Sequence, residues 1–212
     1  MSYKIPRIYP ITDTRVSGLT HAEQVERLIA GGARLIQLRD KTATPRQFFA
    51  DATNALKIAR QHDVKIIIND RADIALALRA DGLHLGQEDL PPAEARRLLG
   101  EQAIIGYSTH SVEQAREAVS MPIDYLAIGP IFPTSSKLRP DPVIGLDNLR
   151  EVRRIVGDLP LVAIGGVTRI TLESVFDAGA DSVAVISDIL STPTEIEIRM
   201  RDFLSTASAQ RG

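Results

Sequence analysis

Short apolar segments alternate with helical patterns along this chain, and this alternation limits the possible folds more than any other feature of the sequence. The clearest example is residues 65–92, where the apolar runs 66–68 and 83–85 flank a helical pattern at 72–78. A strand, a helix and a second strand in this order form a parallel βαβ unit. Both apolar runs end in polar residues, so the unit carries chemically useful side chains at the ends of both strands.

The same plan recurs along the whole chain. Two helix starts carry local signals: Thr20 precedes Glu23 in a capping-box pattern, and Thr44 precedes Pro45 at the first helical position. A glycine pair at 31–32 ends the first of these helices. We expect strands at 7–12, 35–38, 66–68, 83–85, 103–107, 125–128, 161–164 and 182–185, helices at 20–31, 44–62, 72–78, 91–99, 111–119, 146–156, 169–178 and 194–203, and a loose tail from about residue 205.

Eight strands that alternate with helices predict a parallel sheet closed into a single (β/α)8 TIM barrel spanning residues 1–212. A length of 212 residues is short for this fold and leaves little room for a second domain. An open doubly wound sheet is the competing architecture. It usually carries a glycine-rich dinucleotide turn after the first strand, and neither that pattern nor a Walker A motif occurs in this sequence.

Composition excludes several classes of function. No apolar run approaches the roughly 18 residues that cross a membrane, and residues 1–10 lack the apolar core of a secretion signal. There is no cysteine, which excludes disulfides and thiolate chemistry and permits the cytoplasmic location that we expect. A net charge of −2 with 4% aromatic residues gives no sign of nucleic-acid binding.

The loops that follow the strands of such a barrel gather at one face, where active sites lie. Gln37, Arg39 and Lys41 leave the second strand at a spacing of two, which puts them on the same side of an extended chain. A basic pair at the mouth of a pocket suits a diphosphate. The alternative is a solvated charge cluster in which Asp40 separates Arg39 from Lys41.

Two carboxylates, Asp70 and Asp89, follow neighbouring strands and can converge on one cation. Two carboxylates with waters and a substrate phosphate are a usual arrangement around Mg²⁺. The alternative is that each aspartate caps the helix that follows it. Their proximity to Asn69 and to the basic pair favours a metal site, whereas Glu88 fits the surface better.

Two further side chains point toward the same place. His84 lies within a strand, close to the floor of the expected pocket, where a binding role is more plausible than a general-base role. Ser108 follows the fifth strand and is suited to donate to a phosphate oxygen. Its alternative role, capping the next helix, is better filled by Ser111.

The segment 129–145 is much longer than the connections typical between a strand and the next helix. Long loops at the active face of a barrel often act as lids. Thr134 and Ser136 carry hydroxyls in this segment, and Lys137 is its expected phosphate contact. The alternative is a plain surface excursion with Lys137 in solvent.

Backbone donors form a second candidate anion site. Gly165 and Gly166 follow the seventh strand, and Ile186 and Ser187 follow the eighth. Loops at these positions are the usual phosphate site of this fold, because glycine allows backbone N–H groups to approach the oxygens closely. A cation-rich site with a metal and a second site made of backbone donors would suit two phosphorylated small-molecule substrates.

The segments that follow occur in the order in which one family carries them: IYPITD, QLRDK, INDRADIALALRADGLHLGQEDLP, IIGYSTHS, GPIFPTSSK, GLDNLREVR, VAIGGV and ADSVAVIS. Over roughly residues 8–190 the chain resembles the thiamine phosphate synthase family. The resemblance implies a Mg²⁺-dependent (β/α)8 enzyme. It would condense 4-amino-2-methyl-5-hydroxymethylpyrimidine diphosphate with 4-methyl-5-(2-phosphooxyethyl)thiazole, or its carboxylated form, to give thiamine phosphate and pyrophosphate.

The resemblance also implies a role for each matching residue. Ser108, Lys137 and Arg39 would act on the leaving diphosphate. Asp70 and Asp89 would hold the metal. The pyrimidine diphosphate would be bound by Gln37, Arg39, Lys41, Asn69, Ser108 and Lys137, with His84 and Gln87 along the pyrimidine. The thiazole phosphate would be bound by Thr134, Ser136, Gly166, Ile186 and Ser187.

Two departures from the family stand in one loop. The family often has threonine where this chain has Ser136, and the residues 138–140 are unlike the usual lid sequence.

One alternative function is that of a TenI-type thiazole tautomerase, in which His110 would match the proton-transferring histidine. Another is a non-catalytic module that binds thiamine precursors. The metal pair and the cations favour the synthase, and the sequence leaves the oligomeric state open, a homodimer included.

Overall fold

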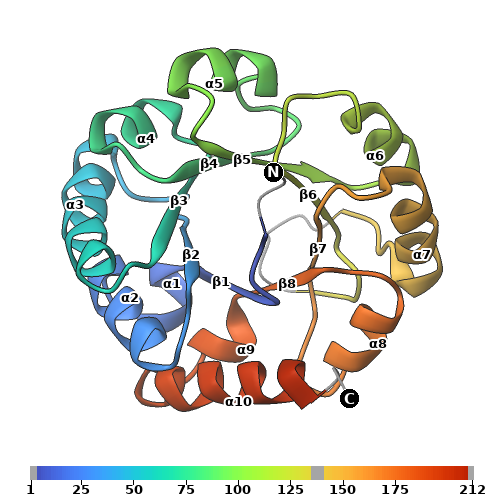
Figure 1. Ribbon diagram of the computed structural model, residues 1–212. Coiled ribbons are helices and arrows are strands. Elements are labelled where there is room, and N and C mark those ends of the chain that lie inside the picture. The colour runs from blue at the N-terminus through green and yellow to red at the C-terminus, as the bar shows by residue number, and fades with distance from the viewer. Residues whose placement is uncertain (1–3, 135–140, 210–212) are drawn as a thin grey trace.

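Eight parallel strands close into a barrel in chain order in the computed structural model, which describes residues 4–134 and 141–209 (Figure 1). The predicted (β/α)8 barrel is therefore confirmed, and each strand lies within two residues of its predicted bounds. The strands are β1 Ile8–Thr12, β2 Leu35–Leu38, β3 Lys65–Asn69, β4 Gly82–Leu85, β5 Ile104–Thr109, β6 Tyr125–Ile128, β7 Leu161–Ile164 and β8 Ser182–Val185.

Helices form a ring outside the strands (Figure 1). The helices are α1 Thr14–Ser17, α2 His21–Ala30, α3 Pro45–Gln61, α4 Ala72–Leu78, α5 Pro92–Leu99, α6 Val112–Ala118, α7 Gly145–Val156, α8 Leu172–Asp177, α9 Ser187–Leu190 and α10 Ile196–Ser208. Both predicted helix starts are confirmed: Thr20 and Thr44 each make a capping box, with Glu23 and Gln47 respectively. These local bonds satisfy backbone amide groups that have no partner within the helix. Because the partners are only three residues apart, the sequence alone was enough to predict both helix starts.

The chain end differs from the prediction. A loose tail from residue 205 is wrong over residues 205–208, because α10 continues to Ser208 and Ala207 is buried. Met200, Phe203 and Ala207 recur at helical spacing on one face, and that face packs into the core between the barrel and its helices. The gain from burying this face holds the last turn in place. Two one-turn helices, α1 and α9, were not predicted as separate elements.

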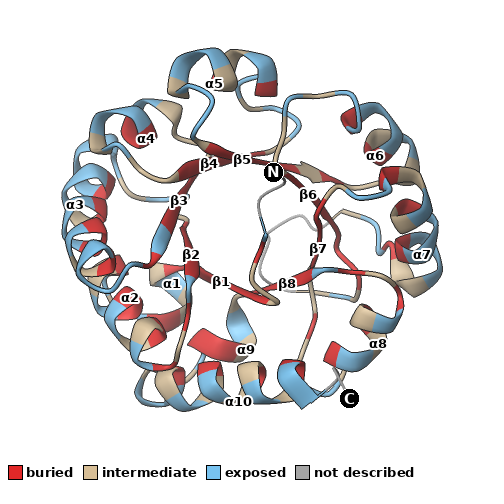
Figure 2. Ribbon diagram, in the orientation of Figure 1, coloured by how far each residue is buried: buried red, intermediate tan, exposed pale blue. Residues whose placement is uncertain are grey.

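Apolar side chains pack in two layers, one between the strands and the helices and one inside the barrel, and Figure 2 shows the strands as the most continuously buried part of the chain. The inner layer contains Tyr9, Leu35, Ile67, Ile104 and Tyr125. Side chains of alternate residues point inward along each strand. Toward the carboxyl ends of the strands these inward positions become polar, and the filled interior gives way to a cavity.

Within residues 4–134 and 141–209, none of the helices combines the length and the apolar character needed to cross a membrane.

Candidate active site

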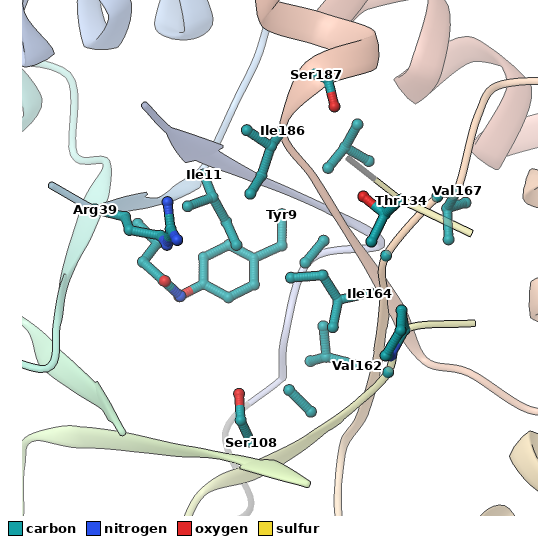
Figure 3. Close-up of a pocket in the computed structure, with 18 of the residues that line it drawn as sticks. Tyr9, Ile11, Arg39, Ser108, Thr134, Val162, Ile164, Val167, Ile186 and Ser187 are labelled. Atoms are coloured by element: carbon teal, nitrogen blue, oxygen red, sulfur yellow. The ribbon is translucent and has the colours of Figure 1, made fainter. Parts of the chain in front are cut away.

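A cavity of about 490 Å³ opens at the carboxyl ends of the strands, a volume typical of small-molecule sites. Figure 3 shows Tyr9 across its centre, Arg39 on one side, and Thr134 with Ser187 on the other. Most of the residues proposed from the sequence lie in its wall: Gln37, Arg39, Lys41, Asn69, Asp70, His84, Asp89, Ser108, Thr134, Gly166, Ile186 and Ser187.

Of the other three proposed residues, one lies outside that wall and two lie outside the described residues. Gln87 is exposed, and its Nε2 donates a 2.6 Å hydrogen bond to the backbone carbonyl of Ser108. It therefore supports the neighbouring loop at the rim. Ser136 and Lys137 lie outside the described residues, as does the central part of the predicted lid, 135–140.

The cations at the end of β2 are held by carboxylates. Arg39 donates a hydrogen bond of 2.8 Å to Asp13, the residue after β1, and Lys41 forms an ion pair with Asp70 after β3. Neither pairing was foreseen in detail, because each joins residues at least 26 positions apart. These contacts hold both cations over one side of the cavity, so Arg39 and Lys41 are more than solvated strand-end charges.

The loop that carries Lys41 is fixed by Asp40. Its carboxylate accepts hydrogen bonds from the backbone of Thr42 and Ala43 and from the hydroxyl of Thr14. Burial acts to raise the pKa of Asp40, but the hydrogen bonds outweigh it and lower that pKa to about 2. An ionised Asp40 therefore anchors the turn between β2 and α3 at every physiological pH.

Asp70 and Asp89 come together as their strand order requires. Asp70 has a φ of 60°, a left-handed conformation that is uncommon outside glycine, and its backbone N–H donates to the carbonyl of His84 at 2.8 Å. Burial raises the pKa of Asp89, and the adjacent carboxyl of Asp70 raises it further. Two acidic groups in mutual contact at a partly buried site form a good binding environment for a divalent cation.

The capping alternative fails for both aspartates. Helix α4 has Arg71 at its N-cap and α5 has Pro91, and neither helix start receives a side-chain cap. Asp89 instead accepts a hydrogen bond of 2.7 Å from the backbone N–H of Gly86, within its own loop. No cluster of three or more metal-ligating side chains occurs in the described part of the chain, so any metal here would take its remaining ligands from water and substrate.

Ser108 lies at the end of a series of buried contacts across the barrel. His84 Nε2 is 2.8 Å from Ser108 Oγ, and His84 Nδ1 is 2.9 Å from the hydroxyl of Tyr125. That hydroxyl is 3.0 Å from the hydroxyl of Tyr9, which in turn accepts from Gln37 Nε2 at 3.0 Å. Ser111 caps α6, as predicted, so Ser108 is not used as a cap.

The opposite end of the cavity is built from backbone. Gly165 and Gly166 have φ values of 95° and 65°, which side chains rarely adopt. A Cβ on Gly166 would lie 2.5 Å from the carbonyl oxygen of Pro133, so this turn also needs the small residue for close packing. Thr134 and Ser187 lie at the same end in Figure 3, with their hydroxyl oxygens visible beside the cavity.

His110 also lines the cavity. Its Nδ1 is 2.7 Å from the carbonyl oxygen of Gly129 and 3.6 Å from a carboxylate oxygen of Asp141. These contacts hold the imidazole near the beginning and the end of the long loop that follows β6.

Comparison with known proteins agrees with this geometry. Residues 8–189 match the model of a family described as thiamine monophosphate synthase. The chain belongs to this family. A thiamine-phosphate synthase of Koribacter versatilis is 47% identical over 208 residues, or 95% of both chains, and one of Chloroflexus aurantiacus is 43% identical over 186 residues, or 87% of this chain and 85% of the relative.

A solved structure matches as well. The thiamine phosphate pyrophosphorylase of Pyrococcus furiosus superposes with a TM-score of 0.86 at 34% identity, over 97% of both chains. The family resemblance inferred from the sequence is thereby confirmed, together with the fold.

Sequence reasoning missed two side chains of this thiamine monophosphate synthase family member, Tyr9 and Tyr125. Both lie in the apolar layer inside the barrel, and Tyr9 also lines the cavity. A usable signal existed: Gly106 occupies the inward position opposite Tyr125, and a Cβ there would lie 2.0 Å from the tyrosine Cζ. A strand glycine opposite a tyrosine indicates a ring lying across the neighbouring strand.

Proposed function

We propose that this chain is a thiamine phosphate synthase. It condenses 4-amino-2-methyl-5-hydroxymethylpyrimidine diphosphate with 4-methyl-5-(2-phosphooxyethyl)thiazole, or its carboxylated form, and releases pyrophosphate. The observation that carries the proposal is one cavity with two unlike ends: Arg39 and Lys41 beside Asp70 and Asp89, and a glycine turn with hydroxyls opposite. Two phosphorylated substrates need two separate anion sites that face one reaction centre.

The diphosphate belongs at the cationic end. Arg39 offers a planar pair of donors and Lys41 a point charge, which together suit the oxygens of a diphosphate. Asp70 and Asp89 would hold Mg²⁺, whose fit rests on their contact and on the raised pKa of Asp89. When bound there, Mg²⁺ would neutralise charge on the leaving pyrophosphate.

The protein's own groups act by placement. Ser108 lines the same cavity and would donate to an oxygen of the leaving group. Positive charge that develops on the CH₂ as the diphosphate departs spreads into the electron-rich aminopyrimidine, so no protein nucleophile is required. Val162 and Ile164 give the cavity an apolar wall that excludes water and favours attack by the thiazole nitrogen.

The remaining roles follow the family pattern. Asn69, His84 and Gln37 lie where the pyrimidine would bind, and Gln87 supports them from the rim through the backbone of Ser108. Backbone at Gly166, Ile186 and Ser187, with Thr134, would bind the thiazole phosphate. For Ser136 and Lys137, outside the described residues, we propose contacts to the thiazole phosphate and to the diphosphate, respectively. We also propose a cytoplasmic location, which cell fractionation tests.

The reaction is tested directly with the purified protein and both phosphorylated substrates. We expect thiamine phosphate and pyrophosphate in equal amounts with Mg²⁺, and a loss of at least about 100-fold after chelation or in Asp89→Ala. Glu88→Ala is the matched control, because Glu88 is the exposed acid next to Asp89 on the same loop. Unchanged turnover in the presence of a chelator, or in Asp89→Ala, would overturn the metal assignment.

A second candidate is favoured by the position of His110 in the cavity wall. A thiazole tautomerase would use such a histidine to move a proton on the thiazole carboxylate. Incubation of that thiazole isomer without any pyrimidine distinguishes the two functions. Isomerisation that His110→Asn abolishes supports the tautomerase, whereas product that forms only with both substrates supports the synthase.

A further inference from the structure

A continuous series of hydrogen bonds crosses the barrel interior from β2 to β5. It runs from Gln37 to Tyr9 at 3.0 Å, to Tyr125 at 3.0 Å, to His84 at 2.9 Å, and to Ser108 at 2.8 Å. The four members other than Ser108 are between 0% and 7% exposed. Burial keeps bulk water from exchanging with these groups, so each of them depends on partners within the protein.

Two directions of donation fit this series, and the first of them starts from the Gln37 amide. The Gln37 amide nitrogen donates to the Tyr9 oxygen, and in this direction the Tyr9 hydroxyl donates to Tyr125. In the same direction, the Tyr125 hydroxyl donates to His84 Nδ1. A neutral imidazole that accepts at Nδ1 carries its proton on Nε2, and this N–H donates to Ser108 Oγ. The hydroxyl proton of Ser108 then remains for a group in the cavity.

The opposite direction would have the opposite chemical result. If Tyr125 donated to Tyr9, His84 would carry its proton on Nδ1, and its Nε2 would accept from Ser108. Ser108 would then offer the cavity only lone pairs, as an activated nucleophile does. A departing diphosphate needs a donor, so only the first direction suits the reaction.

The packing around Tyr125 fixes the position of its ring. Its ring stacks on His84, with centroids 5.6 Å apart at 20°, and meets the Tyr9 ring edge-on at 5.9 Å. Gly106, in register with both His84 and Tyr125, leaves the space that the ring fills. Three strands thus fix where the Tyr125 hydroxyl lies.

We propose that Gln37, Tyr9, Tyr125 and His84 form a directional hydrogen-bond relay that makes Ser108 a donor toward the leaving diphosphate. Tyr9, Tyr125 and His84 are positioning residues in this relay, because they act through Ser108. The consequence for catalysis rests on the proposed synthase function, whereas the direction of the relay is a property of the free protein.

The relay is tested by ¹⁵N NMR of the histidine side chains in the substrate-free protein, with the His84 signals assigned by their loss in His84→Gln. We expect His84 as the Nε2–H tautomer, and a changed Nδ1 signal in Tyr125→Phe and, to a smaller extent, in Tyr9→Phe. Ser182→Ala is the control, since Ser182 is a buried barrel serine whose hydroxyl has no hydrogen-bond partner in the described part of the chain. An Nδ1–H tautomer in the wild type, or a spectrum that Tyr125→Phe leaves unchanged, would overturn the relay.

Kinetics test the consequence separately. We expect Tyr125→Phe to lower kcat about tenfold while KM for the diphosphate changes less than about twofold, because the loss acts on the leaving group. Ser182→Ala should leave both constants near those of the wild type. A normal kcat in Tyr125→Phe would refute the positioning role of the relay. The absence of any product with the wild type would refute the synthase function and leave the NMR result to decide the relay alone.

Discussion

Arg39 donates a hydrogen bond of 2.8 Å to Asp13, across the carboxyl ends of β1 and β2. Both side chains are largely buried, at 12% and 4% exposure. Asp13 also accepts from the backbone N–H of Arg15 at 3.0 Å, which caps α1. One carboxylate thus starts a helix and aims the cation that we assign to the diphosphate.

Asp13→Asn keeps a cap acceptor and removes the charge that holds Arg39. We expect about 2 kcal/mol less stability toward urea, since a partly buried cation loses its partner, and a KM for the diphosphate that rises about tenfold. The control is Asp147→Asn, whose ion pair with Arg150 is solvent-exposed and should make no measurable contribution to stability. A stable variant with a normal KM would contradict the role of Asp13.

Replacement of Asp89 should separate stability from activity. Burial and the neighbouring Asp70 raise the pKa of Asp89, so its contribution to stability is largest below its ordinary pKa of 3.8 and is lost as pH rises through the raised value. At neutral pH the ionised carboxyl therefore destabilises the metal-free protein.

We accordingly expect Asp89→Asn to raise the Tm in chelator while abolishing turnover. Mg²⁺ should raise the Tm of the wild type and leave that of Asp89→Asn unchanged. Glu88→Gln should behave as the wild type in each respect. Thermal unfolding with chelator and with Mg²⁺ measures the wild type and both variants. A response to Mg²⁺ in Asp89→Asn equal to that of the wild type would exclude Asp89 as a ligand.

His21 predicts a pH dependence of stability. Burial lowers its pKa below the ordinary 6.5, although the nearby carboxylates of Asp51 and Asp40 act in the opposite direction. A histidine with a lowered folded pKa contributes stability that is present above pH 6.5 and is lost as pH falls through the folded pKa, because the unfolded chain binds the proton first.

Urea unfolding from about pH 8 to about pH 5 should therefore show a shallower loss of stability in His21→Asn than in the wild type. The variant should also be about 1–2 kcal/mol less stable at the alkaline end, because the imidazole is buried against Phe48. His62→Asn, at an exposed histidine, should keep the slope of the wild type. Equal slopes in all three proteins would show that His21 does not govern this range.

Gly166→Ala tests the backbone site. Its φ of 65° strains any side chain, and the added Cβ would meet the carbonyl of Pro133, so we expect a loss of about 2–3 kcal/mol and weaker binding of the thiazole phosphate. Gly18→Ala is the matched control: Gly18 has a φ of 70°, but a Cβ there meets nothing within 4 Å. It should cost about 1 kcal/mol, with a normal KM. A KM in Gly166→Ala equal to that of the control would argue against a phosphate site at this turn.

The local part of the structure could be read from the sequence. Thr20 with Glu23, and Thr44 with Pro45, marked helix starts because capping involves residues only a few positions apart. Asp70 and Asp89 were expected to converge because the order of parallel strands in a barrel fixes which strand ends are neighbours. The end of α10 was misjudged, since what holds Ala207 is burial against the core.

By itself, the sequence determined the eightfold alternation, the face on which the polar strand ends gather and the identity of most of the side chains in the cavity. Tertiary structure alone decided which partner each of them has. Tyr9 and Tyr125 are 116 positions apart and meet only when the barrel closes, and Asp13 finds Arg39 across two strands. Hydrogen bonds depend on distance and angle to a few tenths of an ångström, whereas a pattern of residue types specifies only the side of the strand on which each group lies.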